Sequence, residues 1–397
     1  MTLRIALILV AVAFGPFQAA AAEPGTFFPI MAWDGVPNDP AVLKKMHDCG
    51  LTVAGFVPPA ALDACQAAGL KAIVSDQRVG GYDWQRVDAK DARKRVTELT
   101  HEVRNHPAVF GYYLRDEPSA SFFPGLAAVA SVVKELHPGV WPYINLFPNY
   151  ATPDQLGAAD YPDYLAKFVA ACKPTTMSYD NYSLLDNGAL RDGYWSNLEQ
   201  MRAAARKANV PFWNIVLSCA HFSYREPTAA DLKFEAYTTL AYGGRGISYF
   251  TYFCPQVGNY RAAPIDQFGN ETPTWGYMQN VNLQIQKLAP TLLKLTSDDV
   301  YHFGAKPPEG CHGPGEQSLL SGINSDAMAG DFTHEDGSRW VLIVNRDVKN
   351  SFPCMPRYRK AVRKVEMLSP YNGTLMPFEG EQLWVAPGAG VLLKLTM

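Results

Sequence analysis

Two adjacent carboxylic acids, Asp116 and Glu117, end an apolar and aromatic segment of the sequence and are followed by a proline. The segment before them, residues 109–114, has the length and composition of a buried strand. Carboxyl groups that are close together and desolvated raise each other's pKa, because each disfavours the ionised form of the other. A carboxyl that stays protonated near neutral pH can donate its proton to a leaving oxygen. The pair therefore indicates acid catalysis, and an acidic start to the following helix is the alternative.

Further polar and aromatic residues follow other strand-like segments of the chain. They are Trp33, Asp34, Asp76, Arg78, Arg115, Asn145, Asn149, Tyr179, Asp180, Tyr182, His221, Tyr224, Tyr249, Tyr252, Phe253 and Trp275. Aromatic rings stack on the apolar faces of sugar rings, while amides and carboxylates hydrogen-bond the hydroxyl groups. We therefore expect a carbohydrate-binding site. Its expected catalytic residues are Glu117, Asp180 and Asp116. Its expected substrate-binding residues are Trp33, Asp34, Asp76, Arg115, Asn145, Tyr179, Tyr182, His221, Tyr252 and Trp275.

The elements that would position these residues alternate between strand and helix. Eight short apolar segments are expected strands: 29–33, 52–57, 71–75, 109–114, 143–147, 175–179, 212–217 and 246–252. Helical patterns lie at 40–49, 59–68, 91–105, 122–136, 160–172, 191–208, 229–242 and 275–295. Thr228 with Asp231 is typical of a helix start. Eight such units predict a closed (β/α)₈ TIM barrel, in which the residues after each strand meet at one face. The competing open sheet usually has a Gly-rich turn after its first strand, and residues 34–37 do not form one.

The helical pattern ends near residue 297. Short strand patterns follow at 331–334, 339–345, 364–368, 382–385 and 390–395, and residues 335–338 are typical of a hairpin turn. The sequence therefore predicts a catalytic barrel over residues 23–297 and a small antiparallel β-sandwich domain over residues 298–397.

The first 22 residues are typical of a signal peptide. Arg4 precedes an apolar run, and four alanines ending at Ala22 form a small-residue cleavage site. A membrane anchor would need about 20 apolar residues, and Gly15 and Pro16 interrupt this shorter run. We therefore expect export to the periplasm or the medium after cleavage near Ala22, with no stable membrane insertion.

The composition of the chain limits the kinds of partner and cofactor that we expect it to bind. With 35 Lys and Arg against 38 Asp and Glu, the chain lacks the concentrated positive charge that nucleic-acid binding needs. None of the seven cysteines lies in a zinc-like spacing, and we expect no metal and no cofactor. Cys219 and Cys254 follow consecutive expected strands, so a disulfide between them is a hypothesis. The expected partner is a carbohydrate substrate, and the oligomeric state is left open.

Residues 112–118 resemble the strand-4 signature of clan A glycoside hydrolases, and the aromatic segment 246–252 is similar to the eighth strand of family 42 β-galactosidase-like barrels. The resemblance implies that Glu117 is the acid/base. Asp116 stands where those enzymes usually have Asn. Their nucleophilic Glu at the end of the seventh strand has no counterpart in residues 217–221, and Glu226 lies further on, as expected for a helix-entry residue.

Several mechanisms remain open. Asp180 is the best-placed second carboxylate, as base or nucleophile. The adjacent Asp116 and Glu117 also resemble the pair of substrate-assisted N-acetylhexosaminidases, and residues 177–180 resemble a chitinase strand. A non-catalytic carbohydrate-binding barrel is suggested by the missing seventh-strand Glu. A metal-dependent hydrolase would need Asp34, Asp76, Asp116 and Asp180 to converge.

Overall fold

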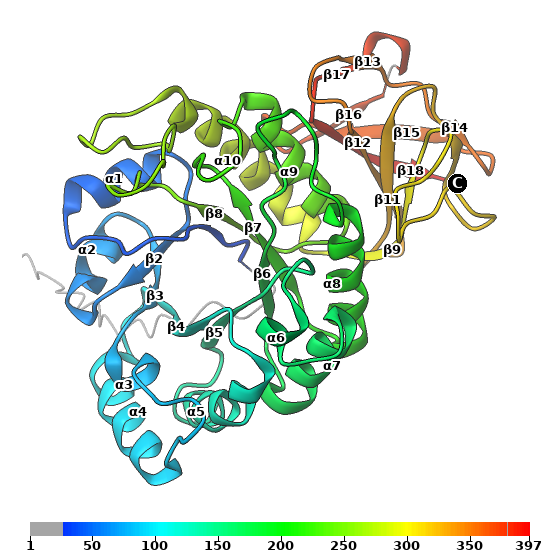
Figure 1. Ribbon diagram of the computed structural model, residues 1–397. Coiled ribbons are helices and arrows are strands. Elements are labelled where there is room, and N and C mark those ends of the chain that lie inside the picture. The colour runs from blue at the N-terminus through cyan, green and yellow to red at the C-terminus, as the bar shows by residue number, and fades with distance from the viewer. Residues whose placement is uncertain (1–26, 379) are drawn as a thin grey trace, which may run out of the picture.

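The computed structural model describes residues 27–378 and 380–397 and has a closed eight-stranded parallel barrel at its centre (Figure 1). The barrel strands are β1 (Ile30–Ala32), β2 (Val53–Val57), β3 (Lys71–Val74), β4 (Val109–Asp116), β5 (Trp141–Leu146), β6 (Met177–Asp180), β7 (Phe212–Leu217) and β8 (Ile247–Phe250). Each strand pairs with the next along the chain, and β1 pairs with β8 to close the ring. The predicted TIM barrel is confirmed.

Helices surround the ring, as Figure 1 shows. They are α1 (Pro40–Asp48), α2 (Leu62–Ala67), α3 (Gln77–Gly80), α4 (Ala89–Val103), α5 (Phe123–Leu136), α6 (Pro153–Leu156), α7 (Tyr161–Cys172), α8 (Tyr194–Ala208), α9 (Ala229–Ala241) and α10 (Pro273–Leu292), with single 3₁₀ turns at Pro59–Ala61, Ala120–Phe122 and Gly380–Gln382. Local sequence sets where they begin: Asp88 and Asp160 cap α4 and α7, and the expected capping box of Thr228 and Asp231 starts α9.

The inside of the barrel is filled, so the ring is a core rather than a channel. Its side chains are Met31, Val53, Ile73, Phe110, Trp141, Tyr143 and Trp213, with Phe27, Trp33, Phe56 and Tyr113 partly buried against them. Large aromatic rings supply much of this volume. Trp213, for example, lies edge-on to both Trp141 and Tyr143 at centroid distances of 5.3 and 5.2 Å.

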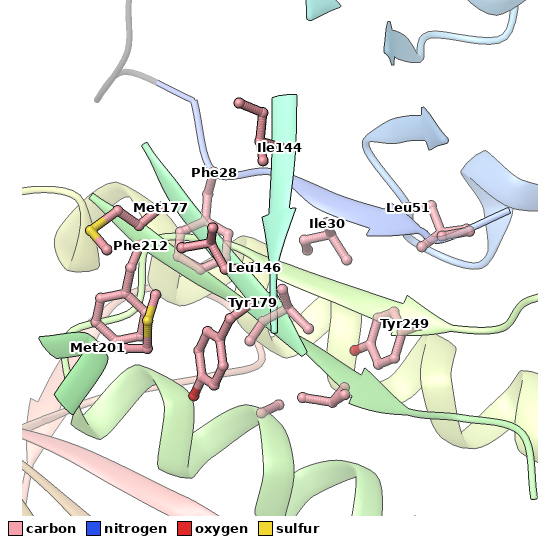
Figure 2. Close-up of a cluster of buried hydrophobic side chains, with 14 of the residues drawn as sticks. Phe28, Ile30, Leu51, Ile144, Leu146, Met177, Tyr179, Met201, Phe212 and Tyr249 are labelled. Atoms are coloured by element: carbon pink, nitrogen blue, oxygen red, sulfur yellow. The ribbon is translucent and has the colours of Figure 1, made fainter. Parts of the chain in front are cut away.

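The larger core lies between the strands and the helices. Figure 2 shows part of it, where Met177, Tyr179 and Phe212 from the strands gather with Met201 of α8. Successive residues of a strand point to opposite faces, so a strand residue enters either this outer core or the barrel interior.

The C-terminal domain is built on an antiparallel six-stranded sheet in the order β16-β15-β18-β12-β11-β9. Its strands are β9 (Leu295–His302), β11 (Ala327–His334), β12 (Arg339–Asn345), β15 (Lys364–Leu368), β16 (Leu375–Pro377) and β18 (Gly390–Thr396). Two small sheets pair β10 (Leu320–Gly322) with β14 (Arg357–Tyr358) and β13 (Phe352–Pro353) with β17 (Trp384–Val385). The expected hairpin turn joins β11 to β12. The first strand starts at Leu295, slightly before the expected boundary.

The central strands of this sheet, β11, β12 and β18, are buried on both faces. In β12, Val341 and Ile343 belong to a second hydrophobic core inside the domain, whereas Leu342 and Val344 pack into the outer core of the barrel. The barrel-facing side lies against α9, and Figure 1 shows the domain beside α8, α9 and α10. Burial on both faces explains why β12 reads as an unbroken apolar run rather than an alternating one.

Gly330 of β11 provides a test of the contact between the C-terminal sheet and α9. A Cβ atom at Gly330 would lie 2.1 Å from the backbone oxygen of Ala241, at the end of α9. Backbone cannot rotate away as a side chain can, so we expect Gly330→Ala to destabilise the protein by about 1–3 kcal/mol, the usual cost of overpacking. The midpoints of thermal and urea unfolding measure this. Gly276→Ala in α10 is the control, because its Cβ meets open space. Equal midpoints for Gly330→Ala and the wild type would contradict the close contact.

Two further expectations concern the signal peptide and a disulfide between Cys219 and Cys254. The expected signal peptide, residues 1–22, lies outside the described residues. All seven cysteines are free thiols, so the hypothesised Cys219–Cys254 disulfide is not formed, although the two side chains are within hydrogen-bonding reach. Burial raises the pKa of Cys219 to about 12, which keeps the thiol protonated and unreactive. Within the part of the chain that the structure describes, no helix is both long enough and apolar enough to cross a membrane.

Candidate active site

Three carboxyl groups meet at the carboxyl ends of β4 and β6. The strand register brings this about: Asp116 of β4 pairs with Asn145 of β5, and Asn145 pairs with Ser178 of β6. Asp180 lies two residues beyond Ser178, so it points to the same side of β6. The Asn145 amide Nδ2 lies between the two aspartates and donates to Asp116 Oδ1 at 3.1 Å and to Asp180 Oδ1 at 2.8 Å.

Glu117 completes the group and has an unusual backbone. Its φ is +41°, in the left-handed region that a glutamate seldom adopts. Its backbone N–H donates to the carbonyl oxygen of Asn145 at 2.9 Å, and its carboxyl lies within hydrogen-bonding reach of that of Asp180. A non-glycine residue in this conformation costs of order 1–3 kcal/mol and persists where surrounding contacts enforce it, often at functional sites. In this conformation the Glu117 carboxyl lies beside that of Asp180.

The three carboxyls shift one another's titration. Burial raises the pKa of Glu117 to about 7; the charge of Asp116 adds to the rise, and the hydrogen bond with Asp180 opposes it. Burial, then the charges of Glu117 and Asp116, also raises the pKa of Asp180 well above its ordinary value. Burial raises the pKa of Asp116, against the hydrogen bond from Asn145. Since Glu117 and Asp180 are in contact, their carboxyls titrate as a coupled pair, and the pKa of each is raised.

An aromatic floor lies beside the carboxyls, formed by Trp33, Phe56, Tyr113 and Tyr143. Trp33 lies edge-on to Phe56 and Tyr113, with centroids 4.5 and 5.9 Å away, and Phe56 packs on Tyr113 at 4.2 Å. Trp33, Phe56 and Tyr113 are each half-buried. The charge of Asp116 contributes to a raised pKa of Tyr113, after burial, so this floor adjoins the acids. Phe56 was not singled out from the sequence, although it lies one residue before the end of β2.

An aromatic wall stands above β6, β7 and β8. The ring of Tyr182, after β6, packs against Phe250 of β8 and against His221, with ring centroids 5.2 and 5.7 Å apart. The His221 ring stacks on Tyr260 with centroids 5.2 Å apart. The charges of Asp180, Asp116 and Glu117 add to the burial that raises the pKa of Tyr182, so this wall adjoins the acids as well. His221 is buried, its Nδ1 hydrogen-bonds the Cys219 carbonyl, and burial lowers its pKa.

Tyr150 and Arg191 also belong to this region and were missed in the sequence. The Tyr150 hydroxyl accepts from the backbone N–H of Tyr182 at 3.4 Å, and the Arg191 guanidinium lies 4.5 Å over the Tyr150 ring. Arg191 also donates to the Tyr224 hydroxyl at 2.9 Å. Tyr150 follows β5 as Tyr182 follows β6, and this position was the available signal. Arg191 lies in a long loop before α8, where no local pattern indicates it.

The other residues expected to bind substrate have partners within the protein. Asp34 accepts from the backbone N–H groups of Tyr252 and Phe253 at 2.5 and 3.3 Å, which ties the end of β1 to the end of β8, and burial raises its pKa to about 8. Tyr252 is buried, and its hydroxyl accepts from Trp275 Nε1 at 2.9 Å. Asn145 is likewise buried and hydrogen-bonded to protein groups.

Asp76, Arg115 and Tyr179 differ in their surroundings. Asp76 caps α3 and binds Arg78 through both carboxylate oxygens at 2.8 Å, and the hydrogen bond to Arg78 leads the causes that lower its pKa. Arg115 is exposed and lies 5.7 Å from the Phe122 ring. Tyr179 lies in the outer core beside Met201 (Figure 2), on the opposite side of β6 from Ser178 and Asp180, so it does not face the carboxyl group.

The end of β7 carries no acid near the three carboxyls. Glu226, further along that loop, is exposed and paired with Arg261 at 2.9 Å. Among the described residues, no cluster of three or more His, Cys, Asp or Glu side chains is arranged to hold a metal ion. The convergence of Asp34, Asp76, Asp116 and Asp180 that a metal-dependent hydrolase would need is not seen, because Asp76 and Asp34 are bound elsewhere.

Comparison with solved structures shows where else this fold occurs. A β-galactosidase from the psychrophilic Marinomonas ef1 aligns with a TM-score of 0.51 at 12% identity over 66% of this chain, which spans 60% of that protein. A family 5 glycoside hydrolase from Bacteroides vulgatus aligns with a TM-score of 0.58 at 12% identity, covering 93% of this chain and 89% of the other. A third structure, a glycoside hydrolase, gives 0.59 at 12% identity, with 93% and 92% covered.

The chain shares the fold of these glycoside hydrolases. Two of the three alignments include the C-terminal β domain, since they cover 93% of this chain. No protein-family model matches the sequence, and no curated protein matches it either. At 12% identity the likeness establishes architecture, and function has to be inferred from the site itself.

Proposed function

We propose that the protein is a glycoside hydrolase in which Glu117 protonates the leaving glycosidic oxygen. The observation that carries the proposal is the contact between the Glu117 and Asp180 carboxyls, at the carboxyl face of the barrel and beside the aromatic floor. A pair that holds one proton near neutral pH supplies both an acid and an anion, which glycosidic cleavage requires. The shared fold and the resemblance around residues 112–118 support the same activity.

Asp180 takes the second role in this proposal. In inverting enzymes the two carboxyl groups stand about 6.5–9.5 Å apart, to leave room for a water molecule, and in retaining enzymes about 5–5.5 Å apart. Carboxyls within hydrogen-bonding reach of each other leave no such room. The contact favours retention, with Asp180 as the nucleophile from β6. It also counts against a non-catalytic barrel, because a second carboxyl lies beside Glu117 although the seventh strand supplies none.

Substrate assistance is the second candidate. Asp116 directly precedes Glu117 and is half-buried, with one oxygen held by Asn145. A carboxylate fixed in this way can orient an N-acetyl group of the substrate, whose carbonyl oxygen then acts as the nucleophile. This route also retains configuration, but it restricts the substrates to N-acetylhexosaminides.

A panel of chromogenic glycosides, assayed with the wild type and Glu117→Gln in parallel, tests the proposal. We expect the wild type to hydrolyse at least one glycoside, and the anomeric configuration of the first product, read by NMR, to be retained. Activity confined to N-acetylhexosaminides would favour substrate assistance. A panel that gives no hydrolysis, or hydrolysis equal in the two proteins, would overturn the assignment of Glu117.

The pH dependence of kcat/KM gives an independent prediction. An acid must be protonated to act, and the pKa of Glu117 is raised to about 7. As pH rises through 7, Glu117 loses its proton and kcat/KM should fall about tenfold per pH unit. Rates on a non-ionisable glycoside between pH 4 and 9 measure this limb. Denatured-protein controls at pH 9 separate ionisation from unfolding, and an alkaline limb near pH 4.5 would show that Glu117 is not perturbed.

A further inference from the structure

A buried chain of hydrogen bonds lies behind the carboxyls and reaches them from β5 and β6. The Tyr143 hydroxyl bonds Ser178 Oγ at 2.8 Å, Ser178 Oγ donates to Asn145 Oδ1 at 2.9 Å, and Asn145 Nδ2 donates to Asp116 and Asp180. Tyr143, Ser178 and Asn145 are at most 1% exposed. We refer to these three residues as the relay.

The hydrogen bonds give every link of the relay a direction. The N–H₂ group of Asn145 faces Asp116 and Asp180 and donates to both, and a carboxylate oxygen accepts such bonds. The amide oxygen then faces Ser178 and takes its single hydroxyl proton. Ser178 can therefore only accept from Tyr143, which makes Tyr143 the donor at the start of the chain. Turning the amide over would leave buried groups unpaired, at a cost that keeps it in place.

The relay bears on where the shared proton lies. Asp180 is buried more deeply than Glu117, and burial alone favours the neutral form of Asp180. The N–H of Asn145 at 2.8 Å opposes this, because a hydrogen bond to a carboxylate stabilises its ionised form. Asn145 makes the same bond to Asp116 but none to Glu117. Of the three carboxyls, Glu117 is thus the one that receives no stabilisation of its anion from the amide.

We propose that Asn145 is a positioning residue that keeps the proton shared by Glu117 and Asp180 on Glu117, with Ser178 and Tyr143 holding its amide in the required direction. The inference deepens the proposed function and rests on it, because a proton on Glu117 leaves Asp180 as the anion. It assigns Asn145 to the acid pair, away from direct contact with substrate.

Other charged and titratable groups lie near the pair, and of these only Tyr143 is changed in the test. They are Asp116 and Arg115 of β4, Tyr113 of β4, Tyr143 of β5, Tyr150 after β5, Tyr161 and Tyr164 of α7, and Tyr179 and Tyr182 on β6 and its loop. Burial raises the pKa of each tyrosine above its ordinary value, so each remains neutral across the range in which the carboxyls titrate.

The test compares Asn145→Leu, which keeps the volume and removes both donors, with Ser178→Ala and Tyr143→Phe. Ser248→Ala is the matched control, because Ser248 is a buried barrel serine whose hydroxyl has no hydrogen-bond partner in the described chain. Infrared titration with ¹³C-labelled glutamate or aspartate shows which residue type carries the proton, without any substrate. The Glu117 signal is assigned from its loss in Glu117→Gln, and circular dichroism checks folding.

In the wild type and in Ser248→Ala we expect a protonated glutamate at pH 6 that titrates near pH 7. In Asn145→Leu we expect that glutamate to be ionised at pH 6 and an aspartate to be protonated instead. The pKa of the alkaline limb of the kcat/KM profile should then rise by about one pH unit, while the maximum rate falls about tenfold. In Ser178→Ala the proton and the pKa of the limb should shift in the same direction but by less, and in Tyr143→Phe the shift should be smallest.

A glutamate that stays protonated at pH 6 in folded Asn145→Leu and Ser178→Ala overturns the proposal. If Asn145→Leu does not fold, the Ser178→Ala titration alone decides. A loss of rate with the pKa values of both pH limbs unchanged would show that Asn145 has only a structural role, and this result also overturns the proposal. Absence of glycosidase activity in the wild type would instead overturn the proposed function, and the infrared titration would still report on the relay.

Discussion

Glu117→Gln is expected to lower kcat/KM on glycosides with poor leaving groups by about three orders of magnitude, within the range that loss of a general acid produces. Glutamine has nearly the same shape but carries no acidic proton, so the leaving oxygen would depart as an unstabilised anion. Aryl glycosides with good leaving groups depend less on this proton, and their rates should fall less. Rates for a series of aryl glycosides therefore give a second readout, a slope that steepens in the variant.

Folding should survive this change, because glutamine can keep a hydrogen bond to Asp180 and removes a repelling charge. The melting temperature relative to the wild type checks this. Glu226→Gln is the matched control: Glu226 is an exposed acid paired with Arg261 and stands apart from the carboxyl group, so its rate should stay within about twofold of wild type, as expected for a surface salt bridge. Turnover in Glu117→Gln equal to that of Glu226→Gln would rule out Glu117 as the acid.

Asp180→Ala is expected to cause a comparable loss, about three orders of magnitude or more, and one that azide can partly restore. Asp180 is 4% exposed, and in the proposed mechanism it supplies the anion of the acid pair. The alanine variant opens space for a small anion, and azide that attacks there gives a glycosyl azide of inverted configuration. Product analysis by NMR, together with rates in azide, measures both effects.

The Asp116→Asn variant separates the two retaining mechanisms. If Asp180 is the nucleophile, Asp116→Asn should retain much more activity than Asp180→Ala, because asparagine still accepts a hydrogen bond from Asn145. If an N-acetyl group of the substrate attacks instead, Asp116→Asn should be the more damaged of the two, and azide should not restore Asp180→Ala. Full activity in Asp180→Ala would contradict both roles for that residue.

Much of the fold could be predicted from local pattern. The bounds of β7, β12 and β15 agree with the expected segments, because β7 and β12 are compact, mainly apolar runs and β15 alternates apolar residues with Lys364 and Glu366. The strand β9 was missed. It follows α10 after only two residues, and Ser297, Asp298 and Asp299 give it a polar middle, so its strand character depends on pairing with β11. A strand defined by its partner has a weak local signal.

The acids were foreseeable, but their arrangement was not. Asp116, Glu117 and Asp180 each follow an apolar strand, which placed them at one face of a barrel. The pairing of Asp116 with Asn145, and of Asn145 with Ser178, is a matter of register between strands about 30 residues apart in the chain. Tyr179 shows how sensitive this is: adjacent to Asp180 in sequence, it points into the outer core, because neighbouring strand residues face opposite sides.

The sequence by itself determined the number and order of the barrel units, the β domain that follows them, and the identity of the candidate acids, because strand, helix and turn preferences act between near neighbours. Only the tertiary structure decided that Glu117 touches Asp180, that Asn145 lies between two aspartates, and that burial raises the pKa of Glu117 to about 7. Register, contact and desolvation arise from packing among strands far apart in the chain, and no short segment encodes them.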